Sequence, residues 1–457
     1  MASVIMRADG SSNFARGNRW GYFPSVSAGW VITNENFMEG VTNWMDFFKI
    51  RASWGQNGNS NIENFQYLAT VAFNRYSNYY FDKTGVNVGG YPDILSNSDV
   101  TWETSEQLNI GFDARFLASR LGVAFDWYKK STKDWLVQAP ILASYGTGAP
   151  YINGGDVENK GVEIALNWND NVGRDFTYGA NVNFTYLKNE VTRIANEEGV
   201  IHGESNVLSQ GTTEMYRAEV GRPIGYFYGY KTEGIFQNQA QIDEYIAAGK
   251  GVISGVQPGD VIFHDLNGDG VIDENDKTMI GNPHPKYQVG LSLNFGYKAW
   301  DLSLTGLGSF GHQIAKSYRS FADSQFQNYT TEVFDRWHGE GTSNKWPRLT
   351  AGSHTNYQYI SDIWIENADY FRLQNITLGY DFKKLFPKMA LGQARIYVTA
   401  QNLFTITGYS GMDPEIGYGG DAPTYDNPRS QGDWASGIDL GYYPNPRTYL
   451  IGVNLKF

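Results

Sequence analysis

The 457-residue sequence contains no cysteine, so disulfide frameworks and thiolate metal sites are excluded. Long hydrophobic runs are also missing. No stretch approaches the about 18 consecutive apolar residues of a membrane-spanning helix, which excludes helical membrane spans. The net charge is −12, with 36 Lys and Arg against 48 Asp and Glu. This acidic balance argues against a nucleic-acid partner.

The last ten residues, 448–457, alternate between two kinds of side chain, with Leu450 as the one exception. Odd positions are apolar or aromatic, and even positions are mostly polar: Tyr449, Ile451, Val453, Leu455 and Phe457 against Thr448, Leu450, Gly452, Asn454 and Lys456. A period of two predicts a β-strand with one apolar face. Strands of outer-membrane barrels have this pattern, with one face toward lipid and the other toward the lumen.

The same pattern recurs along the chain and predicts about 12 strands. From residue 104 onward, tight turns near 119–120, 170–174 and 296–298 alternate with long connections, of which 189–285 is the longest. Barrels of the outer membrane have short periplasmic turns and long extracellular loops. Aromatic residues make up 15% of the sequence, as expected for two interfacial girdles. We therefore predict an all-β, antiparallel transmembrane β-barrel, with a secreted β-sandwich or propeller as the alternative.

The long loop 189–285 contains a pattern typical of calcium-binding loops. Side-chain oxygens fall at positions 1, 3, 5, 9 and 12 and a main-chain carbonyl at position 7, which makes the predicted ligands Asp265, Asn267, Asp269, Asp273, Asp276 and Val271. Gly270 at position 6 permits the sharp turn. Asp276 replaces the usual bidentate Glu and has a shorter arm. The sequence predicts a structural calcium ion that stiffens this loop, and a solvated acidic turn is the alternative.

Signals for catalysis are absent from the sequence. The six histidines form no metal-binding pair at helical spacing, and there is no nucleophile elbow. We therefore predict that the chain is not an enzyme. Aromatic residues of the loops could stack on sugar rings or bind peptides, although most are expected to serve packing: Tyr76, Tyr79, Tyr80, Tyr226, Tyr228, Tyr230, Trp346, Tyr357 and Tyr359.

Several runs closely resemble the SusC/RagA family of TonB-dependent outer-membrane transporters. They include NRWGYFPSVSAGW at 18–30, RASWGQNG at 51–58, IGNPHPK at 280–286, YFRLQNITLGY at 370–380, AQNLF at 400–404 and PNPRTY at 444–449. The resemblance implies a barrel of about 22 strands around a plug, in the outer membrane of a Gram-negative bacterium. It also implies import of oligosaccharides or oligopeptides, driven by TonB–ExbB–ExbD and assisted by a SusD-like surface lipoprotein.

The resemblance covers only the C-terminal half of the family. Residues 1–7 lack the pattern of an export signal, and no plug precedes the strands. We therefore expect 1–457 to be the C-terminal part of a longer receptor, a fragment whose contact with TonB would lie in the missing N-terminal part. A siderophore- or vitamin-type TonB receptor and a calcium-binding surface adhesin without transport are the alternatives.

Overall fold

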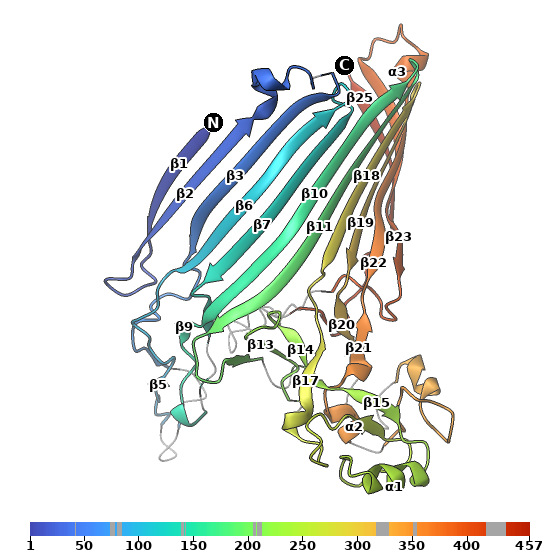
Figure 1. Ribbon diagram of the computed structural model, residues 1–457. Coiled ribbons are helices and arrows are strands. Elements are labelled where there is room, and N and C mark those ends of the chain that lie inside the picture. The colour runs from blue at the N-terminus through green and yellow to red at the C-terminus, as the bar shows by residue number, and fades with distance from the viewer. Residues whose placement is uncertain are drawn as a thin grey trace. The chain divides into compact units, whose positions relative to one another are not determined.

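The computed structural model describes residues 1–41, 43–73, 78–79, 85–138, 141, 143–203, 207, 213–316, 329–350, 354–416 and 436–457. Twelve long strands form one sheet in which each strand bonds to the next along the chain (Figure 1). They are β1 (Ala2–Gly10), β2 (Trp20–Val31), β3 (Met45–Asn59), β6 (Glu103–Phe116), β7 (Leu121–Lys133), β10 (Gly155–Val172), β11 (Phe176–Ile194), β18 (Tyr287–Tyr297), β19 (Trp300–Phe310), β22 (Tyr370–Asp381), β23 (Gln393–Thr407) and β25 (Thr448–Lys456). The prediction of about 12 antiparallel strands is confirmed.

Shorter strands occupy the connections between the long ones. They are β4 (Val71–Ala72), β5 (Tyr91–Pro92), β8 (Leu136–Gln138), β9 (Tyr151–Asn153), β12 (Val200–His202), β13 (Tyr216–Glu219), β14 (Tyr226–Tyr230), β15 (Thr232–Ile235), β16 (Val261–Phe263), β17 (Lys277–Gly281), β20 (Gln313–Lys316), β21 (Ile365–Asn367) and β24 (Ile438–Asp439).

Helices are few and short. The α-helices are α1 (Gln239–Ala247), α2 (Thr355–Gln358) and α3 (Phe382–Leu385). The 3-10 helices are η1 (Ile32–Asn34), η2 (Asn36–Met38), η3 (Ala143–Tyr145), η4 (Glu274–Asp276), η5 (Thr331–Asp335) and η6 (Asp362–Trp364). Within the described part of the chain, no helix is both long enough and apolar enough to cross a membrane.

The chain divides into two compact units. The first comprises 1–166, 186–201 and 219–222, and the second comprises 167–185, 202–218 and 223–457. In the first unit, a small core forms beside the strands from Phe14, Ile62, Val100 and Tyr151. In the second unit, a larger hydrophobic cluster forms within the long connections.

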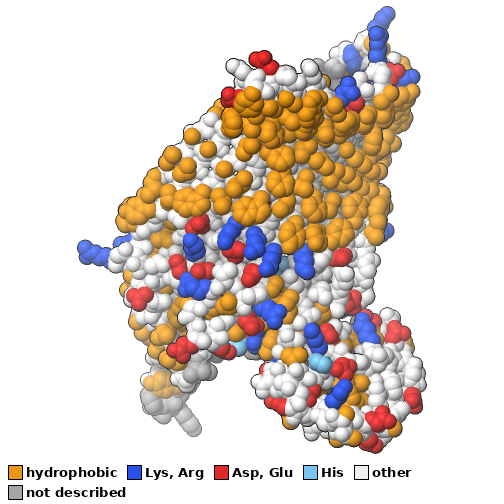
Figure 2. All heavy atoms as spheres, in the orientation of Figure 1, with side chains coloured by type: hydrophobic (Ala, Val, Ile, Leu, Met, Phe, Trp, Pro, Cys, Tyr) orange, Lys and Arg blue, Asp and Glu red, His pale blue; other side chains and the backbone are white. Residues whose placement is uncertain are grey.

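The long strands expose apolar side chains on one face. In β25, Ile451 and Val453 are 77% and 61% exposed, and their partners across the ladder are Val398 and Ile396 of β23. Figure 2 shows hydrophobic side chains gathered over the strands, with Lys, Arg, Asp and Glu beyond them. A water-soluble sheet buries such a face, whereas the lipid-facing surface of a membrane barrel leaves it on the outside.

Two strands extend beyond the residues whose apolar alternation predicts them. β10 begins at Gly155 and β11 continues to Ile194, so strand residues occupy the ends of segments that the sequence predicts as loops. The reason is that the period-two pattern continues with charged side chains. Glu158 of β10 bonds to Lys129 of β7 at 2.6 Å and to Lys160 at 3.2 Å. The apolar pattern therefore marks the hydrophobic band and not the ends of the strands.

The alternation of apolar residues in β22 changes phase at 374–375, and the structure has a β-bulge there. Toward β19, Thr305 pairs with Asn375 and Gly306 pairs with Leu373, which leaves Gln374 as the extra residue of β22. Toward β23, Leu373 pairs with Phe404 and Asn375 pairs with Gln401, so two residues of β23 lie opposite Gln374. The register of β19 shifts at the same level, between Thr305 and Gly306. The bulge keeps Phe371 and Leu373 on the apolar face, together with Ile376 and Leu378.

Candidate functional site

The predicted calcium loop lies between β16 and β17, in the second unit. Asp265 at its start accepts hydrogen bonds from three main-chain N–H groups, those of Gly268 at 2.7 Å, Gly270 at 2.9 Å and Gly251 at 3.0 Å. Gly268 and Gly270 have φ of 73° and 83°, a conformation that side chains other than glycine disfavour. Asp265 therefore fixes the fold of the first half of the loop.

The remaining predicted ligands continue this network. Asn267 accepts from the N–H of Asp269 at 3.0 Å, and Asp269 accepts from that of Val271 at 2.9 Å. Asp276 is 1% exposed, and its carboxylate accepts from the N–H groups of Leu266 and Asp273, both at 2.8 Å. Asp276 thus joins the end of the loop to its beginning.

Electrostatics in the loop favour ionised carboxylates. Burial raises the pKa of Asp265, but the N–H groups of Gly270, Gly251 and Gly268 outweigh it, and the net result is a lowered pKa. A carboxylate that remains charged is the form that a cation requires.

The donor atoms match calcium in chemical type, since all are oxygens of carboxylate, amide or carbonyl groups. In the structure, however, the carboxylates are bonded to the loop's own N–H groups. Within the described part of the chain, no group of three or more His, Asp or Glu side chains is placed to hold a metal ion. The six residues share one loop, and calcium binding stays a prediction.

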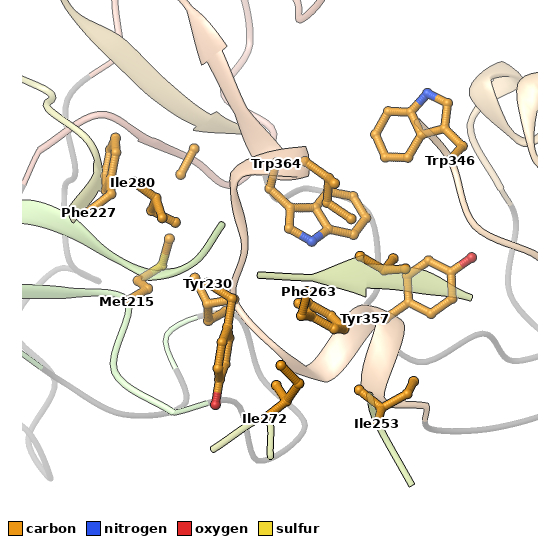
Figure 3. Packing of buried hydrophobic residues seen from close by; sticks show 14 of the residues in the cluster. Met215, Phe227, Tyr230, Ile253, Phe263, Ile272, Ile280, Trp346, Tyr357 and Trp364 are labelled. Atoms are coloured by element: carbon orange, nitrogen blue, oxygen red, sulfur yellow. The ribbon is translucent and has the colours of Figure 1, made fainter. Parts of the chain in front are cut away.

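The calcium loop is anchored to a hydrophobic cluster through Ile272, which is 8% exposed. The cluster joins connections that are far apart in the sequence, and Ile438 of β24 also belongs to it. Figure 3 shows Met215, Phe227, Tyr230, Ile253, Phe263, Ile272 and Ile280 from the first connection together with Trp346, Tyr357 and Trp364 from the second. We call the described parts of 223–285 and 329–368 the cap.

A buried polar clamp also joins the two halves of the cap. Asp260 is fully buried, and its carboxylate accepts from Arg348 at 2.7 Å and from Asn356 at 2.9 Å. Asn356 in turn accepts from the N–H of Val261 at 3.0 Å. Sequence reasoning missed this clamp because no local pattern links residues so distant in the chain.

Most loop aromatics that were candidates for ligand stacking belong to the interior of the second unit. Tyr226, Tyr230 and Tyr357 are 1% exposed, and Trp346 is 7% exposed. Tyr359 stacks on Tyr230 with ring centroids 4.6 Å apart. The structure thus assigns these five rings to packing. Tyr76 and Tyr80 lie outside the described residues.

The second face of the sheet is polar. In the second unit it carries hydroxyl and amide groups, such as the pair Thr377 and Thr399 at 2.8 Å, and the ion pair of Arg395 with Asp301, also at 2.8 Å. In the first unit Arg51 binds Asp113 at 3.1 Å and also pairs with Asp126. A polar face opposite a lipid-facing one is the arrangement of a barrel wall that lines an aqueous lumen.

Comparison with known proteins agrees with this architecture. A family described as "TonB dependent receptor-like, beta-barrel" matches residues 6–403. TonB-dependent receptor P3 of Formosa agariphila is 32% identical over 455 residues, covering 99% of this chain and 43% of the relative. TonB-dependent receptor SusC of Bacteroides thetaiotaomicron is 31% identical over 461 residues, covering all of this chain and 42% of the relative.

A solved structure of the RagAB peptide transporter matches with a TM-score of 0.78 and 25% sequence identity, covering all of this chain and 46% of that one. The chain therefore spans less than half the length of the relatives that it matches.

Proposed function

Because the chain belongs to the family of TonB-dependent receptor-like β-barrels, we propose that it forms part of the barrel wall of an outer-membrane importer of nutrient oligomers. Its place is the outer membrane of a Gram-negative bacterium. The observation that carries the proposal is the two-faced sheet of twelve strands, apolar on one side and polar on the other. In this proposal the protein transports its substrate across the outer membrane and catalyses no reaction.

The proposed cargo is an oligosaccharide or an oligopeptide. The relative SusC and the RagAB peptide transporter support a nutrient importer of this kind. We propose a SusD-like surface lipoprotein and the TonB–ExbB–ExbD complex as partners. The contact with TonB would be made by a part of the receptor that this sequence does not contain.

The test is growth on defined nutrients. A strain that lacks the gene is compared with its parent on single oligosaccharides and on oligopeptides as the only carbon source. A loss of growth on one class, restored by the complete gene, supports import of that class. Equal growth on every oligomer, together with loss of iron or vitamin uptake, would favour a siderophore- or vitamin-type receptor. Loss of surface attachment alone would favour an adhesin.

We further propose that Asp265, Asn267, Asp269, Val271, Asp273 and Asp276 hold a structural calcium ion. The support is their oxygen donors, their spacing and the loop turn at Gly270. The ion would neutralise the carboxylates and stiffen this loop of the cap, which contributes Ile272 to the hydrophobic cluster.

A further inference from the structure

The connection between β22 and β23 is basic and contains no acidic residue. Residues 382–392 read FKKLFPKMALG, with Lys383, Lys384 and Lys388 as the only charged side chains. Figure 1 shows α3 at the end of β22 that lies away from β20 and β21. This is the end of the strands at which the connections are short, which places it on the periplasmic side.

The same connection exposes apolar side chains among its lysines. Phe382, Leu385 and Phe386 are 39%, 54% and 53% exposed. An aromatic row continues from them onto the outer face of the strands, since Phe382 packs edge-on against Tyr380 at 4.9 Å and Tyr380 against Trp300 at 4.8 Å. Exposed aromatics at the ends of strands mark the level of lipid headgroups.

The lysines keep their positive charge unmatched. Lys383 donates to the carbonyl of Met389 at 2.6 Å, and Lys384 donates to the carbonyl of Lys298 at 2.7 Å. Within the described part of the chain, neither these ammonium groups nor those of Lys298 and Lys388 pair with a carboxylate.

Of the nearby acidic groups, Asp301 is neutralised by an arginine, whereas Asp381 bonds to main-chain N–H groups and keeps its charge. Asp301 is held by Arg395, and Asp381 accepts from the N–H of Lys383 at 2.9 Å. The adjoining turn contributes Arg174 with Asp170 and Asp175, and one of these two carboxylates offsets the guanidinium charge. The four lysines Lys298, Lys383, Lys384 and Lys388 still outnumber the two remaining carboxylates, those of Asp170 and Asp381. The excess charge of this rim is therefore positive.

We propose that this connection is a docking surface for the headgroups of anionic phospholipids in the periplasmic leaflet. The ammonium groups of Lys383, Lys384 and Lys388 would bind the phosphate, while Phe382, Leu385 and Phe386 enter the boundary between headgroups and acyl chains. Basic residues attract anionic lipid, and apolar residues between them bury at the same interface. Charge complementarity commits the site to an anionic phospholipid.

The test measures lipid retained by the receptor purified from outer membranes. The receptor is exchanged into detergent with equal amounts of phosphatidylglycerol and phosphatidylcholine, and native mass spectrometry counts the lipids that stay bound. The variant K383Q/K384Q/K388Q removes the three charges. Its matched control, K231Q/K250Q/K345Q, removes three exposed lysines from the cap.

The wild type and the control are expected to prefer phosphatidylglycerol, and the preference is expected to fall by about fivefold for each connection lysine removed. Heat-modifiable migration checks that every variant is folded. Equal retention of both lipids by the wild type would overturn the proposal. So would an unchanged preference in K383Q/K384Q/K388Q, or an equal loss in the control.

Discussion

Asp260 and Arg348 are separated by 88 residues in the sequence, yet Oδ1 of the carboxylate lies 2.7 Å from Nε of the guanidinium. Asp260 is fully buried, whereas Arg348 is partly accessible. The pair joins the two halves of the cap, and the carboxylate also accepts hydrogen bonds from Asn356 and from the N–H of Gln257. A buried charge in this position is tolerated only because its partners are in place.

Removal of Asp260 is expected to open the cap while leaving the strands intact. In Asp260→Ala, Arg348 and Asn356 lose their acceptor, and the free energy of unfolding of the cap should fall by about 3 kcal/mol. Limited proteolysis would show faster cleavage within 223–285 and 329–368, with heat-modifiable migration unchanged. Glu244→Gln, on the exposed side of α1, is the control and should behave as the wild type. Equal protease resistance in all three proteins would contradict a role for the clamp.

Calcium binding is expected to protect the long loop from proteolysis. The double variant Asp265→Ala with Asp269→Ala removes two predicted ligands and should be cleaved quickly within 189–285, with or without a chelator. The wild type should become equally sensitive only after chelation, because the ion holds the loop together. Asp243→Asn, in α1 and outside the predicted ligand residues 265–276, is the control. If a chelator leaves the wild-type cleavage rate unchanged, the calcium proposal fails.

Acid is expected to loosen the same loop through Asp265. Its folded pKa is lowered from an unfolded value of about 3.9, so the unfolded state binds more protons in this range and the stabilising contribution is complete above about pH 4. As the pH falls through the lowered pKa, the contribution is lost. Hydrogen exchange of the N–H groups of Gly268 and Gly270, measured without calcium, should stay slow down to about pH 4 and speed up below it. In Asp265→Asn this acid-dependent step should disappear, and its persistence would assign it to another group.

Gly161 of β10 has no room for a side chain. A Cβ there would lie 2.1 Å from the carbonyl oxygen of Tyr186 and 2.7 Å from the hydroxyl of Tyr128. Gly161→Ala should therefore push the neighbouring strand away and lower the yield of folded protein in the outer membrane severalfold. Gly290→Ala in β18 is the matched control, since its nearest neighbours are side-chain atoms of Asn183 at 3.7 Å. Similar folded yields for both variants would show that the sheet adapts at residue 161.

Period-two alternation was sufficient to predict the strands. The pattern of 448–457 recurs in β6, β18 and β23, and in the structure residues of the apolar phase pair with one another, as Ile110 and Phe112 of β6 do with Trp127 and Phe125 of β7. The bulge at Gln374 also has a local signature, because a single extra residue reverses the phase of the alternation. These features depend on residues that are close together in the sequence, and periodicity analysis detects only such local patterns.

The cap could not be predicted in the same way. Its core combines Tyr230 and Phe263 with Trp364, and its clamp combines Asp260 with Arg348. These contacts depend on where two long connections meet and not on local periodicity. The loop aromatics therefore remained ambiguous between packing and ligand binding until their burial was known. The calcium loop was recognisable because all of its oxygens lie within twelve consecutive residues.

The shared core of the cap has a consequence for how such receptors diversify. Each of its two halves supplies one side of a single interior, so exchanging one half by recombination would place Trp346, Tyr357 and Trp364 against a foreign surface. Asp260 would then be inherited without Arg348. Crossovers within 286–328 separate the two halves and leave each without its partner surface, whereas crossovers outside 215–438 keep all residues of the cluster together. The two halves of the cap are therefore expected to be exchanged between receptors as one segment, together with the hairpin of β18 and β19 that lies between them in the sequence.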